Sequence, residues 1–385
     1  MTEAPKPTGS RAAMEVFWVF LRIGALSFGG PPAMMALVHS EIVLGRKWLE
    51  EREFLDLVGM VNILPGPNAV EAAMYVGEKR AGRAGFVLGG IAFLLPGALL
   101  AAVLGALYVR YGTTPAAEGL LYGIKPAVIA VTGWMVVRLA KSSRPRPRRL
   151  TLIVAVALAY ALGVDETLLL ACAGAVALAV WWWRTRAERT AERPKTLGLV
   201  LAVPAGQHVD LPALAGAFLK AGALLFGGGA VLLALLRGEL VVDRGWITET
   251  QLLDAITIGQ VTPGPVLNTA TFLGYTLGGP LGALVVSVAV VLPSFLLMTA
   301  CGPILRFIRR HAWSRAVLDG VTLGSIGVLA GVMVEFIRNG IVDPLTAAVA
   351  AGAALVLWRR PKSALALVGA GAVIGLLHLL VPHIP

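Results

Sequence analysis

The chain contains the same apolar sequence pattern twice, and this repetition constrains its fold more than any other feature. Residues 20–67 and 218–265 align at a constant offset of 198 without a gap, and 20 of the 48 aligned positions are identical. Each copy has a Phe-Gly-Gly near its start and a Pro-Gly-Pro at its end. An apolar unit that is duplicated and broken at corresponding places is typical of secondary transporters that bind their substrate between two repeats.

The repeat continues beyond the Pro-Gly-Pro if one residue is dropped, because Gly77 then pairs with Gly274 and Pro96 with Pro293. The residues between the two copies are polar and basic, which predicts a linker, although an amphipathic interfacial helix over part of this stretch is an alternative. We therefore divide the chain into an N-terminal transport repeat (1–183), a basic cytoplasmic linker (184–210) and a C-terminal transport repeat (211–385).

Composition indicates an integral membrane protein. Hydrophobic residues make up 57% of the chain and charged residues 14%, whereas soluble proteins carry about 25% charge. The basic residues cluster at the ends of apolar stretches, as in 144–149 and 306–310, so the net charge of +11 reflects membrane orientation and not nucleic-acid binding. Cys172 and Cys301 belong to no metal or redox motif, and we expect neither a metal nor a cofactor.

Apolar stretches predict an all-α polytopic membrane protein. The expected spans are 14–40, 84–108, 118–140, 150–163, 166–183, 211–236, 281–304, 315–337, 343–358 and 363–381. Four further segments (53–64, 68–79, 251–262 and 266–277) are each about 12 residues long, roughly 18 Å as helix and half of a bilayer. Because Pro-Gly-Pro separates the members of each pair, we expect two re-entrant helical hairpins whose tips face the protein interior.

The spans also predict how the repeats are oriented. If the hairpins do not cross the membrane, each repeat has five crossings, an odd number, so the second copy must be inverted. Loop charge agrees, because the basic loop of the first copy (143–149) and that of the second (306–310) follow non-corresponding spans. We expect the first hairpin to enter from the cytoplasm and the second from the opposite face.

The interruptions predict an anion site without formal charge. A helix that starts after Pro-Gly-Pro offers unpaired backbone N–H groups and the positive end of its dipole. The Phe-Gly-Gly breaks would add two further helix starts, so that four starts converge on one small anion. The alternative is that these residues only permit kinks and close packing. The candidate glycines are Gly29, Gly30, Gly66, Gly227, Gly228 and Gly264.

Polar residues near the breaks are candidates for contacting an anion, since amide and hydroxyl groups donate without adding charge. These candidates are Asn62, Asn68, Gln260, Thr262, Asn268 and Thr269. The alternative is that they bind backbone carbonyls freed by proline.

Arg22 and Lys220 are repeat partners within apolar spans, where they either reach the site or extend to the interface.

Glu71 lies one turn into the helix that follows the first Pro-Gly-Pro, and its counterpart is Asn268 or Thr269. It either pairs with Arg22 or binds and releases a proton, and we include it among the candidate site residues. Asp56 and Asp254 follow the Trp residues that precede each hairpin, and we interpret them as part of an acidic, interfacial helix start.

Several motifs together resemble the chromate ion transporter family in its two-domain, long-chain form. They are the paired Phe-Gly-Gly breaks, the R-x-W-[LI]-x-E-x-x-[FL]-L-D stretch, the Pro-Gly-Pro hairpins and the Leu-Pro downstream of each. The resemblance covers nearly the whole chain. It implies a multi-pass protein of the bacterial inner membrane that exports chromate and confers chromate resistance.

Export of a dianion is physically reasonable, because a dianion leaving an inside-negative cell gains about 4.6 kcal/mol per 100 mV. The alternative is a proton-coupled carrier or a channel for sulfate or another small anion. Export would then need no ATP, and the chain has no G-x-x-x-x-G-K-[ST] nucleotide motif. Its five histidines are scattered and form no H-E-x-x-H motif, which argues against an enzyme. The expected partners are chromate, with sulfate as a competitor, and the lipid bilayer; a homodimer is compatible with this interpretation.

Overall fold

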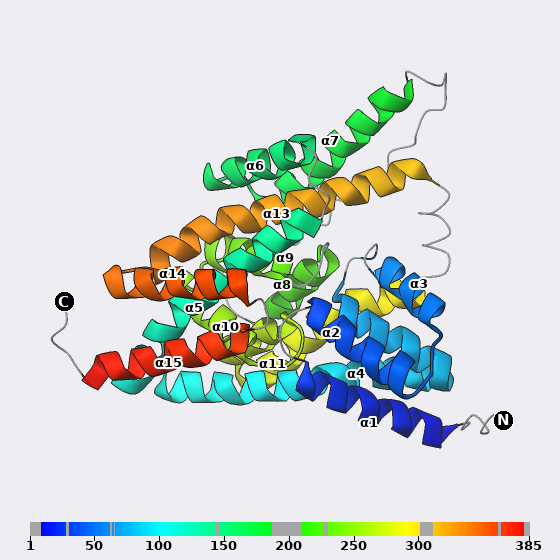
Figure 1. Cartoon of the computed structure of the whole chain (residues 1–385), viewed down its shortest axis with the longest axis horizontal. Coiled ribbons are helices and arrows are strands. Elements are labelled where there is room, and N and C mark those ends of the chain that lie inside the picture. Colours follow the sequence, from blue (N-terminus) through cyan, green and yellow to red (C-terminus); the bar gives the residue numbers. More distant parts are fainter. Residues whose placement is uncertain are drawn as a thin grey trace.

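A computed structural model describes residues 9–27, 31–61, 64, 66–142, 147–186, 210–225, 230–300, 311–360 and 363–380. Within these residues the chain is entirely helical, without a β-strand, which confirms the all-α prediction (Figure 1). Most of the expected linker, residues 187–209, lies outside the described residues.

Among the described residues, the helices of the two halves follow the same order. The first half contains α1 (Ser10–Leu26), α2 (Pro31–His39), the π-helical turn η1 (Ser40–Gly45), α3 (Glu51–Val61), α4 (Asn68–Tyr111), α5 (Pro115–Ser142), α6 (Pro147–Ala161) and α7 (Glu166–Arg186). The second half contains α8 (Leu211–Ala223), α9 (Ala230–Leu236), the π-helical turn η2 (Arg237–Asp243), α10 (Glu249–Val261), α11 (Leu267–Thr299), α13 (Ala312–Gly340), α14 (Pro344–Arg359) and α15 (Ala364–Leu380).

The two longest helices, α4 and α11, each consist of two shorter helices joined by a sharp kink. In α4 the backbone leaves helical geometry at Ala81 and Gly82, where Gly82 has φ 63°, and α11 does the same at Gly278 and Gly279, where Gly279 has φ 62°. The limbs of α4 meet where Gly77 faces Gly85, and a Cβ on either glycine would collide with the backbone of the other. Residues 84–108 therefore form a separate helix, as the sequence predicts.

The same two glycine contacts occur in α11, where Gly274 faces Gly282. Other local features are also duplicated. Lys47 and Gly245 are repeat counterparts and both have positive φ, 54° and 61°. The two π-helical turns occupy corresponding positions, and each is followed by a tryptophan whose backbone N–H bonds the turn, Trp48 to Ile42 and Trp246 to Leu240. The repeat seen in the sequence is thus a repeat of backbone geometry.

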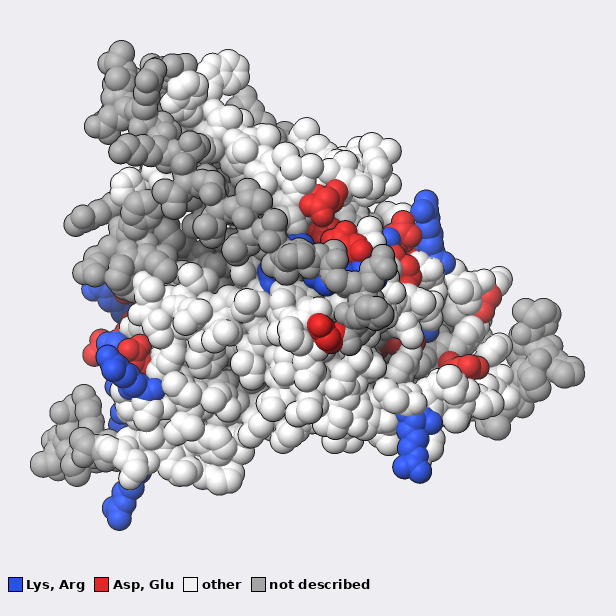
Figure 2. Space-filling model, turned by 180° about the vertical axis from the view of Figure 1, so that it is seen from behind, with Lys and Arg blue, Asp and Glu red and all other residues white. Residues whose placement is uncertain are grey.

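If α4 and α11 are each counted as one helix across their kinks, five helices in the described part of the chain are long and apolar enough to cross a membrane: Asn68–Tyr111, Pro115–Lys141, Glu166–Trp183, Leu267–Thr299 and Ala316–Gly340. Shorter apolar helices accompany them, including Arg149–Ala161, which matches the short span expected at 150–163. In Figure 2 broad areas of one face carry no charged side chain, and Lys, Arg, Asp and Glu gather in separate clusters. Large apolar side chains such as Leu99 and Leu284 are exposed, as lipid contact requires.

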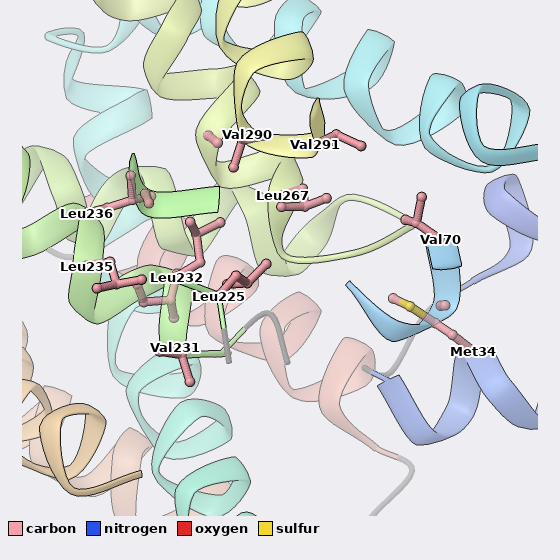
Figure 3. Close-up of a cluster of buried hydrophobic side chains, with 14 of the residues drawn as sticks. Met34, Val70, Leu225, Val231, Leu232, Leu235, Leu236, Leu267, Val290 and Val291 are labelled. Atoms are coloured by element: carbon pink, nitrogen blue, oxygen red, sulfur yellow. The ribbon is translucent and has the colours of Figure 1, made fainter. Parts of the chain in front are cut away.

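Side chains that flank the breaks of both halves share one hydrophobic core (Figure 3). Met34 comes from α2 and Val70 from the first turn of α4, whereas Leu225 precedes the second Phe-Gly-Gly and Leu267 begins α11. Residues beside the breaks of both halves therefore belong to the same buried core. In Figure 1, α13 runs alongside α6 and α7, and α1 alongside α4.

A buried ion pair attaches the second hairpin to the first half of the chain. Lys125 of α5 lies 2.7 Å from a carboxylate oxygen of Asp254 in α10, and the Tyr108 hydroxyl of α4 donates to the other oxygen at 2.8 Å. The Asp254 side chain is only 6% exposed. The interpretation of Asp254 as an interfacial residue is therefore wrong, because two side chains from another part of the sequence enclose it. Its counterpart Asp56 is exposed.

Removing the charge of Asp254 should destabilise the protein, because Lys125 would be left unpaired. We expect Asp254→Asn to lower the free energy of unfolding by about 3 kcal/mol. The matched control is Asp56→Asn, at the exposed counterpart, which should change it by no more than about 0.5 kcal/mol. Thermal unfolding of the purified variants in detergent measures both. Equal effects of the two substitutions would contradict a structural role of the ion pair.

Candidate functional site

The first Pro-Gly-Pro turn packs against two polar side chains. Gly66 is buried, and a Cβ at this position would overlap the Glu71 carboxylate and the Ser294 hydroxyl. Glu71 belongs to the first turn of α4, whereas Ser294 follows Pro293 in α11. The tip of the first hairpin therefore contacts the proline-containing helix of the second half.

The second Pro-Gly-Pro turn makes the corresponding contact in the opposite direction. Gly264 has φ +108°, which L side chains rarely adopt, and it lies against Asn268 and Gly97. Gly97 follows Pro96 in α4, so this tip meets the proline-containing helix of the first half. The Gly264 N–H also donates to the Ser27 carbonyl at 2.7 Å, directly before the first Phe-Gly-Gly.

The side chains that reach back over the two tips differ in chemistry. The Asn268 amide donates to the Pro263 carbonyl at 2.8 Å and to the Thr262 hydroxyl at 3.0 Å, and Thr262 donates to the Gly259 carbonyl at 2.9 Å. In this conformation Asn268 and Thr262 thus bind groups of their own turn. Glu71 lies against the first tip as Asn268 does against the second, which makes Asn268, not Thr269, its structural counterpart.

Several buried polar atoms at the tips have no hydrogen-bond partner. They are both carboxyl oxygens of Glu71, the Ser294 hydroxyl, the Thr269 hydroxyl and the Gln260 amide nitrogen. Glu71 and Ser294 are 0% exposed and Thr269 is 1% exposed. Buried polar atoms are normally bonded, so these groups are available to a polar ligand. The hydroxyls and the amide can donate to an oxyanion.

The helix starts offer fewer donors than an open N-terminus. In α4 the N–H groups of Val70 and Glu71 both point to the Pro67 carbonyl, at 2.8 and 3.2 Å. In α11 those of Asn268 and Thr269 bond Pro265 and Val266. At least two of the first four N–H groups of each helix are therefore already used. The side chains named above carry more of the available hydrogen-bonding capacity than the sequence indicates.

The two candidate cations lie in different surroundings. Lys220 is 2.6 Å from Glu239, whose other oxygen accepts from Arg244 at 2.8 Å, so the Lys220 charge is neutralised within the second half. Arg22 is exposed on α1 and forms no ion pair with the described residues. The alternative in which Glu71 pairs with Arg22 does not occur, because neither Glu71 oxygen has a partner.

Gly29, Gly30, Asn62, Gly227 and Gly228 lie outside the described residues. Asn68 lies at the first tip and is partly exposed.

The sequence interpretation missed Ser294, Gly97, Ser27 and Glu239. A signal for Ser294 and Gly97 existed, because each directly follows one of the repeat-matched prolines. Glu239 and Arg244 likewise repeat Glu41 and Arg46, and Arg46 lies 3.9 Å from Glu41.

Comparison with known proteins identifies the family. The sequence model described as Chromate transporter matches residues 14–180 and again 212–376. A chromate transport protein of Cupriavidus metallidurans is 31% identical over 94% of this chain and 92% of its own length. A probable chromate transport protein of Synechococcus elongatus is 30% identical over 89% of each chain. A chromate transport protein of Pseudomonas aeruginosa is 33% identical over 87% of this chain and 83% of its own.

No solved structure matches the chain. The family comprises transport proteins, so the chain is a transporter and not an enzyme. Its duplicated apolar helices are those of a multi-pass membrane protein, and the chain belongs to the chromate transporter family.

Proposed function

We propose that the protein is a secondary transporter that exports chromate across the bacterial inner membrane. Its membership of the chromate transporter family and its similarity to three chromate transport proteins over most of their length support the substrate. The main evidence for the site is a group of buried, unpartnered polar atoms close to the two tips, of which Glu71 and Ser294 lie together where the first tip contacts the second half. Chromate would bind at this junction.

The chemistry of the junction suits a tetrahedral oxyanion. Chromate has four oxygens that accept hydrogen bonds, and the hydroxyls of Ser294 and Thr269 and the Gln260 amide are neutral donors. Remaining N–H groups at the two helix starts add partial positive charge. Arg22 and Lys220 would supply positive potential farther out, and Lys220 would do so only when its pair with Glu239 opens.

The repeats would provide alternating access. In this proposal they are inverted, so that the two hairpins enter from opposite faces and one half moves against the other around the junction. No nucleotide is required, since export of a dianion gains about 4.6 kcal/mol per 100 mV of membrane potential. Sulfate is the second candidate substrate, because it has the same shape and charge as chromate. Glu71, a carboxyl group at the first tip, supports coupling of transport to protons.

Inversion predicts that equivalent turns lie on opposite sides of the membrane. Arg83 and Pro280 are repeat counterparts directly after the kinks in α4 and α11, and both are exposed. In otherwise cysteine-free protein, Arg83→Cys should react with a membrane-impermeant thiol reagent only from the cytoplasmic side, and Pro280→Cys only from the outside. Reaction of both from the same side would rule out inverted repeats.

Transport is tested in liposomes that contain the purified protein. We expect saturable chromate flux that is driven by the membrane potential, is inhibited by sulfate and is affected little by phosphate. Equal, non-saturable flux of all three anions would indicate a channel and contradict the proposed carrier.

The same assay tests the first tip. Gly66→Ala places a methyl group against Glu71 and Ser294, and we expect it to reduce chromate flux at least tenfold. Gly59→Ala in the preceding helix meets no atom within 4 Å and should leave flux unchanged. Equal flux of both variants, at equal amounts of folded protein, would place the site elsewhere.

A further inference from the structure

Glu71 has a buried carboxyl group with no neighbouring group among the described residues that would stabilise its negative charge. Its side chain is 0% exposed, and neither oxygen has a hydrogen-bond partner. An ionised carboxylate that is buried without a partner is very unfavourable, and such a group takes up a proton instead. The neighbouring Ser294 hydroxyl is neutral and also lacks a partner.

We propose that Glu71 is a proton-binding site, that it carries a proton in this conformation, and that it must carry one for an oxyanion to occupy the first tip. This inference rests on the proposed transport of an oxyanion. It assigns a role to a residue for which the sequence leaves two alternatives, of which pairing with Arg22 is absent from the structure.

The second tip shows what a neutral group does at the equivalent position. Asn268 has two N–H donors and no charge, and it bonds the Pro263 carbonyl and the Thr262 hydroxyl. A protonated Glu71 is likewise neutral and has one O–H donor, whereas the ionised form can only accept. Protonation therefore gives both tips a neutral side chain that can donate.

No charged group on the surrounding elements neutralises Glu71. The titratable side chains that the structure describes on the helices packed against α4 are Arg11, Glu15 and Arg22 of α1, His39 of α2, Glu51, Arg52, Glu53 and Asp56 of α3, Glu249 and Asp254 of α10, and Tyr275 of α11. Several already have partners: Glu15 binds Arg80, Glu53 binds Lys79, and Asp254 binds Lys125. α11, which supplies Ser294, contains no Lys, Arg, Asp or Glu.

Protonation and anion binding are then linked. An ionised Glu71 would place a negative charge directly against Gly66 and repel a dianion at the first tip, whereas the acid would not. Since linkage is reciprocal, the proton strengthens anion binding and the anion strengthens proton binding. Chromate and a proton would accordingly move through the protein together, and release of either would promote release of the other. One net negative charge then leaves the cell with each chromate, so that the gain falls from about 4.6 to about 2.3 kcal/mol per 100 mV.

The protonation state can be measured without substrate. Infrared difference spectra of the purified protein, recorded across a pH titration, should contain the C=O band of a buried carboxylic acid. Glu71→Gln should remove this band. The matched control is Glu78→Gln, which changes an exposed carboxylate on the same helix and should leave the band intact. A spectrum unchanged by Glu71→Gln would show that Glu71 is ionised and would overturn the proposal.

The linkage is measured by chromate binding to the parent and Glu71→Gln at a series of pH values. Above the pH at which Glu71 titrates, the affinity of the parent should fall up to tenfold per pH unit relative to Glu71→Gln. Chromate itself takes up a proton in weakly acidic solution, but this affects both proteins equally and cancels in the ratio. A ratio independent of pH would overturn the linkage. If the parent binds no chromate at any pH, the proposed function fails, and the infrared result still decides whether Glu71 holds a proton.

Discussion

Each Pro-Gly-Pro turn of this protein is completed by the other half of the chain. Polar backbone groups freed by a helix break cannot remain unbonded in an apolar environment. The Gly264 N–H finds the Ser27 carbonyl of the first half, and Gly66 and Gly264 pack against Ser294 and Gly97, which follow the two repeat-matched prolines. The fold and the candidate site are therefore consequences of the same contacts, because breaking the helices requires two halves that meet at the breaks.

The two copies are similar in backbone and different in polar chemistry. In the second copy these polar groups all have partners within the protein. Asn268 forms a hydrogen bond with its own turn, and Lys220 and Asp254 form ion pairs with Glu239 and Lys125. At the corresponding positions of the first copy Glu71 is unpartnered, and Arg22 and Asp56 are exposed. The second hairpin is thus anchored, whereas the first carries the group that can change its charge. This difference agrees with the proposal that Glu71 is the group that binds a proton.

The sequence predicted the helical class and the helix ends on either side of each Pro-Gly-Pro, since glycine, proline and the length of apolar segments act locally. It could not predict which distant residues meet at the tips, so Ser294 and Gly97 were missed although they follow matched prolines. Asp254 was misread because a carboxylate near a helix start is usually interfacial, and only the packing of α5 brings Lys125 to it. The sequence also predicted more free N–H donors at the helix starts than the structure has, because N–H groups of the first turns bond carbonyls of the preceding turn.

The proposed oxyanion site lies where the Pro-Gly-Pro tips contact the opposite halves of the chain. Crystals grown with chromate, measured at the X-ray absorption edge of chromium, would locate the substrate by its anomalous scattering. We expect one strong peak next to the tips, within reach of the Ser294 hydroxyl and the backbone around Gly66 and Gly264. A peak only at basic side chains of the protein surface, with none between the halves, would contradict it.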